Sequence, residues 1–229
     1  IQSLEYFEEN NVKNFYEEFT INYLLSTYSL SEACEYRRAI KDSSLSEDKN
    51  FFLKIDIFCL LLEEKFDEAS LLYSLLLESE KSPDLYFQKL FNKLQKIDNN
   101  ISISNKDIAD EKNIFLYSAM HRIGNLPLTE KFLEIDPLNL SLPIILSYST
   151  EIDLRLKSAH FAFFNNLINV DSLAALYQTV DFTYDELNNP SKVISSLNGN
   201  TEIGMAYYYQ LINIQLLPTT RLNAIMNFW

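Results

Sequence analysis

NFFLKIDIFCLLLEEKFDEASLLYSLLLESEKSP, residues Asn50–Pro83, is the stretch that decides the fold. Apolar residues recur at the three- and four-residue spacing of α-helices over 49–63 and again over 67–79. A short turn at Lys65–Asp67 separates the two segments, and Asp67 is a suitable N-cap for the second helix. The stretch therefore predicts a helical hairpin.

The same helical periodicity continues through nearly all of the chain, and no alternating strand pattern is present. Only three glycines occur in 229 residues, which disfavours the tight turns of β folds. We therefore expect an all-α fold. The polar, aperiodic segment 99–110 is the best candidate for a boundary. It divides helical hairpins in residues 1–98 from a second helical region in residues 111–229, which is either separate or continuous with the first and is less regular.

The first expected helix covers residues 11–28 and has an apolar stripe at helical spacing. We expect the core to bury this stripe, which consists of Val12, Phe15, Tyr16, Phe19, Tyr23 and Leu24. Glu17, Glu18 and Asn22 lie away from it and are expected to face solvent.

With its helix–turn–helix order and length of 34 residues, the Asn50–Pro83 stretch resembles a tetratricopeptide repeat (TPR). Ala69 takes the place of the small residue at which the two helices approach. Asp56 departs from the pattern, which prefers a large apolar residue there. Ser31–Ala33 aligns with Asp67–Ala69 at a spacing of 36 and suggests an earlier copy. The resemblance implies hairpins stacked as a TPR-like α-solenoid that share one continuous core.

A second resemblance covers more of the chain. The order of its segments is similar to that of a group of uncharacterised alphaproteobacterial helical-repeat proteins, which implies no particular activity. The resembling segments are Glu32–Cys34, Asp56–Leu60, Leu116–Leu128, Ser172–Tyr177 and Asp181–Thr183.

Composition and charge narrow the classes of partner. Hydrophobic residues make up 47% of the chain and its mean hydropathy is −0.10, values typical of a folded protein. The formal net charge is −13 and the pI is about 4.6, with no basic stripe. We therefore expect no nucleic-acid binding, which needs cations along the phosphate backbone. No apolar run reaches the roughly 18 residues of a membrane span, so we expect no membrane insertion.

Cys34 and Cys59 are the only cysteines, and they fall on adjacent predicted helices. Paired helices bring two positions within the separation of about 4.4–6.8 Å between Cα atoms that a disulfide needs. A disulfide would indicate an oxidising compartment, such as a periplasm, over the cytoplasm. The alternative is two buried thiols that act as small hydrophobic side chains.

Catalytic patterns are missing from the sequence. His121 and His160 stand among apolar neighbours, without the HExxH spacing of a zinc site. No GxSxG motif provides a nucleophile. We therefore expect no catalytic residues, metal or cofactor, and structural roles for both histidines. An all-helical enzyme with a cryptic site is the remaining enzymatic alternative.

Tyr207, Tyr208 and Tyr209 form an aromatic cluster on a late helix in the charge-poor second half. Neighbouring residues on a helix are about 100° apart, so the three rings cannot all face one surface. Tyrosine is favoured at interfaces, which makes this cluster a candidate partner-binding surface. A well-packed helical core is the alternative. The sequence thus predicts a non-catalytic scaffold or adaptor for a protein or peptide partner, or alternatively a structural or self-assembling domain of a larger complex.

Overall fold

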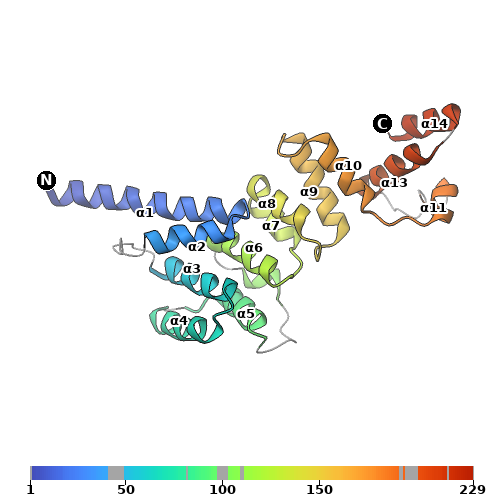
Figure 1. Cartoon of the computed structure of the whole chain (residues 1–229). Helices are drawn as coiled ribbons and strands as arrows, with labels where there is room; N and C mark the ends of the chain where they lie inside the picture. The colour runs from blue at the N-terminus through green and yellow to red at the C-terminus, as the bar shows by residue number, and fades with distance from the viewer. Residues whose placement is uncertain are drawn as a thin grey trace. The chain divides into compact units, whose positions relative to one another are not determined.

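The protein is all-helical. The computed structural model (Figure 1) describes residues 2–40, 49–80, 82–96, 103–108, 111–190, 193, 201–215 and 217–228. The side chains of residues 2–12, 14, 105, 201, 224, 227 and 228 lie outside this description. Within the described ranges there are thirteen α-helices and no β-strand. The chain divides into two compact units, residues 1–135 and 136–229.

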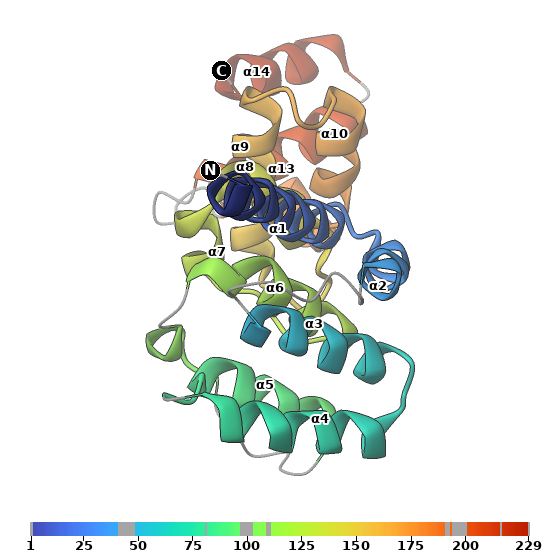
Figure 2. The ribbon, with the colours of Figure 1, turned by 90° about the vertical axis from the view of Figure 1, so that its left-hand side faces the viewer.

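Unit 1 consists of helical hairpins and shorter helices. Helix α1 packs on α2 and α6; α3 packs on α2, α4 and α6; and α5 packs on α6 (Figure 2). The helices are α1 (Gln2–Ser26), α2 (Leu30–Ala39), α3 (Lys49–Leu62), α4 (Phe66–Ser79), α5 (Leu85–Leu94), α6 (Ile114–Ile123) and α7 (Glu130–Ile135).

The predicted hairpin of Asn50–Pro83 is present as α3 and α4. Ala69 is completely buried, as a residue at a close approach of two helices must be. The second helix begins one residue earlier than expected, so Asp67 lies in its first turn and Lys65 is the N-cap. The cause is the tight end of α3, where Glu64 adopts a φ of 59° and the Lys65 N–H donates to the Leu60 carbonyl.

Helix α1 buries the face opposite to the one that the sequence predicts. Its buried face carries Ile21, Leu25 and Glu17. The predicted core stripe was wrong, because its aromatic members Phe15, Tyr16, Phe19 and Tyr23 are between 58% and 71% exposed. The side chain of Val12 lies outside the described residues.

The physical reason is that α1 has two apolar faces. At about 100° per residue, Phe19 and Ile21 lie roughly 200° apart around the helix axis. The contacts with α2 and α6 bury the Ile21 and Leu25 side. Periodicity alone does not distinguish a helix face that packs in the core from a second apolar face.

The division between the two units falls between residues 135 and 136, and the polar segment 99–110 belongs to unit 1. Helices α5 and α6 flank that segment and pack against each other inside unit 1. Asp107 belongs to this segment, and its carboxylate lies 2.7 Å from the ammonium of Lys89 in α5. This ion pair ties residue 107 to α5. The division into units follows the long-range contacts, which the local sequence pattern does not reveal.

Helix α6 ends at Gly124, which lies close to α5. Gly124 has a φ of −82°, and the left-handed residue is Asn125, with a φ of 49°. A Cβ atom on Gly124 would stand 2.7 Å from Cδ2 of Leu94 in α5. The Leu94 side chain would have to shift to admit a larger residue, so the nearness of α5, not the backbone conformation, favours glycine at this position.

Unit 2 packs α9 against α8, α10 and α13, while α13 also packs on α10, α11 and α14. Its helices are α8 (Pro137–Leu146), α9 (Ile152–Phe164), α10 (Val170–Gln178), α11 (Tyr184–Asn188), α13 (Thr201–Ile214) and α14 (Pro218–Phe228). The larger core cluster is formed by Leu156, Ala159, Leu173, Leu176, Tyr177, Val180 and Ala206. Thr183 and Glu186 form a capping box, with both reciprocal bonds, at the start of α11.

Candidate functional site

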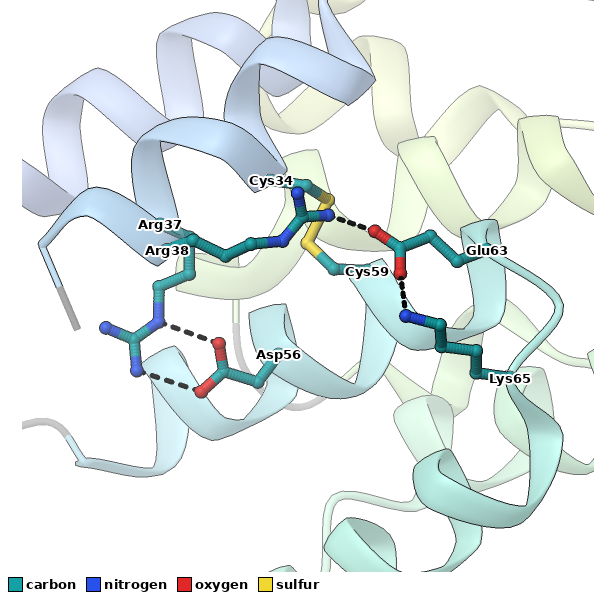
Figure 3. Close-up of a disulfide and its surroundings, with 7 residues drawn as sticks. All are labelled: Cys34, Arg37, Arg38, Asp56, Cys59, Glu63 and Lys65. Carbon is teal, nitrogen blue, oxygen red and sulfur yellow. Dashed lines mark hydrogen bonds and ion pairs between the residues drawn. A yellow bond between two sulfur atoms is a disulfide. The ribbon is translucent and has the colours of Figure 1, made fainter.

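A disulfide joins α2 to α3 (Figure 3). Cys34 and Cys59 are bonded, with their Cα atoms 5.6 Å apart, and both residues are buried. Because α2 and α3 are consecutive helices, the bond closes a loop of 25 residues in sequence separation. It constrains the unfolded chain and holds the two helices together where a surface groove begins.

One helical turn from each cysteine, Arg37 and Asp56 form a second link between α2 and α3. Nε and Nη2 of Arg37 donate to the two carboxylate oxygens of Asp56 at 3.0 and 2.9 Å. The two side chains are only 13% and 16% exposed. The Arg37 guanidinium also lies over the Phe52 ring. This pair accounts for Asp56, which stands where a TPR prefers an apolar residue.

A more exposed charge cluster surrounds Glu63. Arg38 donates through Nη2 to one carboxylate oxygen of Glu63, and Lys65 donates to the other at 2.8 Å (Figure 3). The hydrogen bond from Lys65, together with the positive charges of Arg38 and Lys65, lowers the pKa of Glu63. The side chains of Arg38 and Lys65 are 56% and 50% exposed. The single carboxylate of Glu63 is therefore the ion-pair partner of two solvent-accessible cations.

The disulfide and these charged residues line a groove with a volume of about 330 Å³ between α2, α3 and α4. This volume is at the lower end of the range for ligand-binding pockets. The apolar lining consists of Cys34, Cys59, Leu60, Leu71 and Leu72. The charged lining consists of Arg37, Arg38, Asp56, Glu63, Lys65 and Glu68. We call this feature the disulfide groove.

The aromatic face of α1, defined by Phe15, Tyr16, Phe19 and Tyr23, is a second candidate surface. Phe15, Phe19 and Tyr23 follow at four-residue intervals and form one ridge along the helix. The Phe15 and Phe19 rings stack with centroids 6.5 Å apart. Sequence reasoning found these residues but assigned them to the core, so it missed this surface.

The tyrosines predicted to bind a partner all pack inside unit 2. Tyr207 is completely buried, and its hydroxyl donates to the Glu186 carbonyl at 2.7 Å. Tyr209 is half-buried with its ring 5.5 Å from that of Tyr177. Tyr208 is also half-buried and packs against the smaller core cluster around Tyr207. A partner-binding role stays a prediction for the partly accessible rings of Tyr208 and Tyr209.

The side chain of each histidine is hydrogen-bonded to a tyrosine hydroxyl. His121 is buried, with Nε2 2.8 Å from the Tyr86 hydroxyl and Nδ1 2.9 Å from the Pro127 carbonyl. Since a carbonyl only accepts, Nδ1 carries the proton and Nε2 accepts from Tyr86. Burial lowers the pKa of His121 to about 4. Nε2 of His160 lies 2.6 Å from the Tyr177 hydroxyl.

Lys54 is the centre of a buried polar network in unit 1. Its ammonium lies 2.8 Å from Asp84 and 3.0 Å from Glu80. The Tyr117 hydroxyl donates to the same Asp84 oxygen at 2.5 Å, and Asp84 also accepts from the Phe87 N–H at the start of α5. Asp84 thereby joins α3, α5 and α6, while Glu80, the C-cap of α4, joins that helix to Lys54 of α3.

In the ranges that the structure describes, no three His, Cys, Asp or Glu side chains are grouped so as to hold a metal ion. None of the helices in those ranges combines the length and apolar character needed to cross a membrane. Comparisons with models of protein families, with curated proteins and with solved structures find no match for this chain.

Proposed function

We propose that this chain is a non-catalytic helical-repeat scaffold, built from TPR-like hairpins, that binds a protein partner through the aromatic face of α1. The observation that carries the proposal is the exposure of four aromatic side chains on one helix. Single exposed apolar residues are common on protein surfaces, but a continuous apolar patch is typical of an interaction site.

The chemistry of this face supports a protein partner. Phenylalanine and tyrosine are enriched in the cores of protein–protein interfaces, because their rigid rings bury a large area at a low cost in side-chain entropy. The Ile21 face of the same helix is already packed on α2 and α6. A helix anchored on one side presents its opposite face as a fixed ridge.

The helical-repeat part of the proposal rests on the α1–α2 and α3–α4 hairpins. Helix α2 of the first hairpin packs on α3 of the second, and the Cys34–Cys59 bond joins these two helices. Such an array exposes surfaces for binding without needing a reactive centre.

The test is affinity capture of the tagged protein from its own cells, followed by quantitative mass spectrometry. The variant Phe19→Ser/Tyr23→Ser removes the middle and end of the ridge. The matched control, Phe164→Ser/Tyr184→Ser, removes a phenylalanine and a tyrosine that are 77% and 80% exposed. We expect at least one protein to be captured by the wild type and the control and to be lost with the α1 variant. Identical captured sets for all three proteins would contradict the proposal.

A structural or self-assembling domain is the second candidate, and the same face of α1 also suits it. Light scattering separates the two candidates. Dimers or larger assemblies of the purified chain that dissociate in the Phe19→Ser/Tyr23→Ser variant would favour self-assembly. A monomer in both cases favours the scaffold.

A further inference from the structure

The rim of the disulfide groove has hydrogen-bond donors in excess. Arg38 and Lys65 share one ion-pair partner among the described residues, the carboxylate of Glu63. Each donates to it through one nitrogen. A guanidinium carries five N–H groups and an ammonium carries three. Donors on both side chains are therefore available to an incoming acceptor.

Most carboxylate oxygens that line the groove already accept a hydrogen bond from one of its cations. Both carboxylate oxygens of Asp56 are bound by Arg37. The two oxygens of Glu63 are bound by different cations. The remaining carboxylate, Glu68, belongs to the α4 wall, one turn after Lys65. The three basic side chains of the lining, Arg37, Arg38 and Lys65, are equal in number to its three acidic ones, so the excess is one of hydrogen-bond donors, and it includes those of Arg38 on the α2 wall.

Apolar side chains form the other part of the groove. Leu71 is 66% exposed although it lines the cavity together with Leu60, Leu72 and the disulfide. Covering an exposed aliphatic side chain with another apolar group is favourable by roughly 25 cal/mol per Å². The groove thus offers an apolar contact beside a guanidinium that suits a carboxylate.

We propose that the disulfide groove binds a segment of a protein partner in which an aliphatic side chain stands next to a carboxylate. The aliphatic group contacts Leu60, Leu71 and Leu72, and the carboxylate accepts hydrogen bonds from Arg38. The groove is open to solvent and walled by three helices, so a chain can enter and leave it along the surface. This inference rests on the proposed role in protein binding but uses a surface other than the aromatic face of α1.

The experiment pans a phage library of random dodecapeptides against the immobilised full chain without reductant. Enriched peptides are then synthesised, and their Kd values are measured by fluorescence anisotropy. The groove variant is Arg38→Gln, which removes one half-exposed cation. The control is Lys131→Gln, which makes the same charge change in α7, outside the groove. Circular dichroism verifies that both variants keep the helical content of the wild type.

We expect enriched peptides to carry Leu, Ile or Val next to Asp or Glu. Arg38→Gln should raise their Kd about tenfold, the effect of losing one solvent-accessible charged hydrogen bond, while Lys131→Gln leaves it unchanged. Replacing the peptide carboxylate by an amide should cost the same factor with the wild type and nothing further with Arg38→Gln. This coupling identifies the contact between the peptide and Arg38.

Three results would overturn the inference: no enrichment of peptides, enrichment without an acidic residue beside an aliphatic one, or equal binding to the wild type and Arg38→Gln. The proposed function fails differently. If peptide binding depends on Arg38 while the set of captured proteins is unchanged by Phe19→Ser/Tyr23→Ser, the groove is supported as a binding site and the α1 interface is refuted. If peptide binding is lost in the α1 variant and retained in Arg38→Gln, the groove is refuted as the binding site.

Discussion

Arg37 and Asp56 form a two-bond ion pair between α2 and α3, one helical turn from the Cys34–Cys59 disulfide. The same two helices are therefore joined twice, once covalently and once by charge. Residue 56 shows that a departure from a repeat pattern has a structural cause, since a neighbouring helix supplies its partner.

The first prediction concerns this pair. Asp56→Leu restores the apolar residue that the repeat pattern prefers, but it leaves the Arg37 guanidinium largely buried without its carboxylate. We expect it to lower the free energy of unfolding by about 2 kcal/mol. Arg37→Leu/Asp56→Leu should recover most of the loss, because two apolar side chains replace the pair. Urea denaturation followed by circular dichroism measures both, and a double variant as unstable as the sum of the single ones would refute the idea.

The second prediction concerns the disulfide. Cys34→Ala/Cys59→Ala should lower the free energy of unfolding by about 3.5 kcal/mol, the chain-entropy value for a loop of this length. The reduced wild type should show a similar loss in urea denaturation. A thiol assay on the denatured, unreduced protein provides the check on the bond itself. Two reactive thiols would show that the cysteines are not paired and would remove the argument for an oxidising compartment.

The third prediction tests the orientation of α1. Ile21→Ala removes a completely buried side chain and should cost about 3 kcal/mol of stability. Phe19→Ser changes an exposed position and should alter stability by less than about 0.5 kcal/mol. Thermal and urea denaturation rank the two variants. The opposite ranking would mean that the aromatic face is the one packed in the core.

The fourth prediction is a pH dependence from His121. Its pKa in the folded state is about 4, below the unfolded value of 6.5, so the unfolded chain binds the proton first as the pH falls. The stabilisation is complete above pH 6.5 and decreases as the pH falls towards 4. Between pH 7.5 and 5 we expect a loss of about 2 kcal/mol from this residue. His121→Gln should be less stable at pH 7.5 but lack this slope, and equal slopes in urea titrations would contradict the assignment.

The fifth prediction separates Tyr207 from its neighbour Tyr208 on α13. Tyr207→Phe removes the hydroxyl that donates to the Glu186 carbonyl and should cost about 1 kcal/mol. Tyr208→Phe, the matched control, changes a half-buried ring and should leave the stability nearly unchanged. Differential scanning calorimetry measures both. Equal melting temperatures for the two variants would show that the Tyr207 hydroxyl makes no net contribution.

Part of the candidate site was accessible from the sequence. The sequence left open whether Cys34 and Cys59 are bonded or are two buried thiols, because spacing alone does not determine how helices face each other. The roles of Arg37, Arg38 and Lys65 had no signal in the sequence. Arg37 and Arg38 act through residues beyond their own helix, and Lys65 acts through Glu63 in its own turn. Single charged residues on helices and turns are ordinarily solvated.

The sequence by itself determined the all-helical class and the α3–α4 hairpin, because helical periodicity depends on residues within a few positions of each other. Only the tertiary structure decided which face of α1 is buried, at which residue the chain divides into two units, and that Tyr207 belongs to the core. These features depend on contacts between residues far apart in the chain. An amphipathic pattern shows that a face is apolar, but not which neighbour covers it.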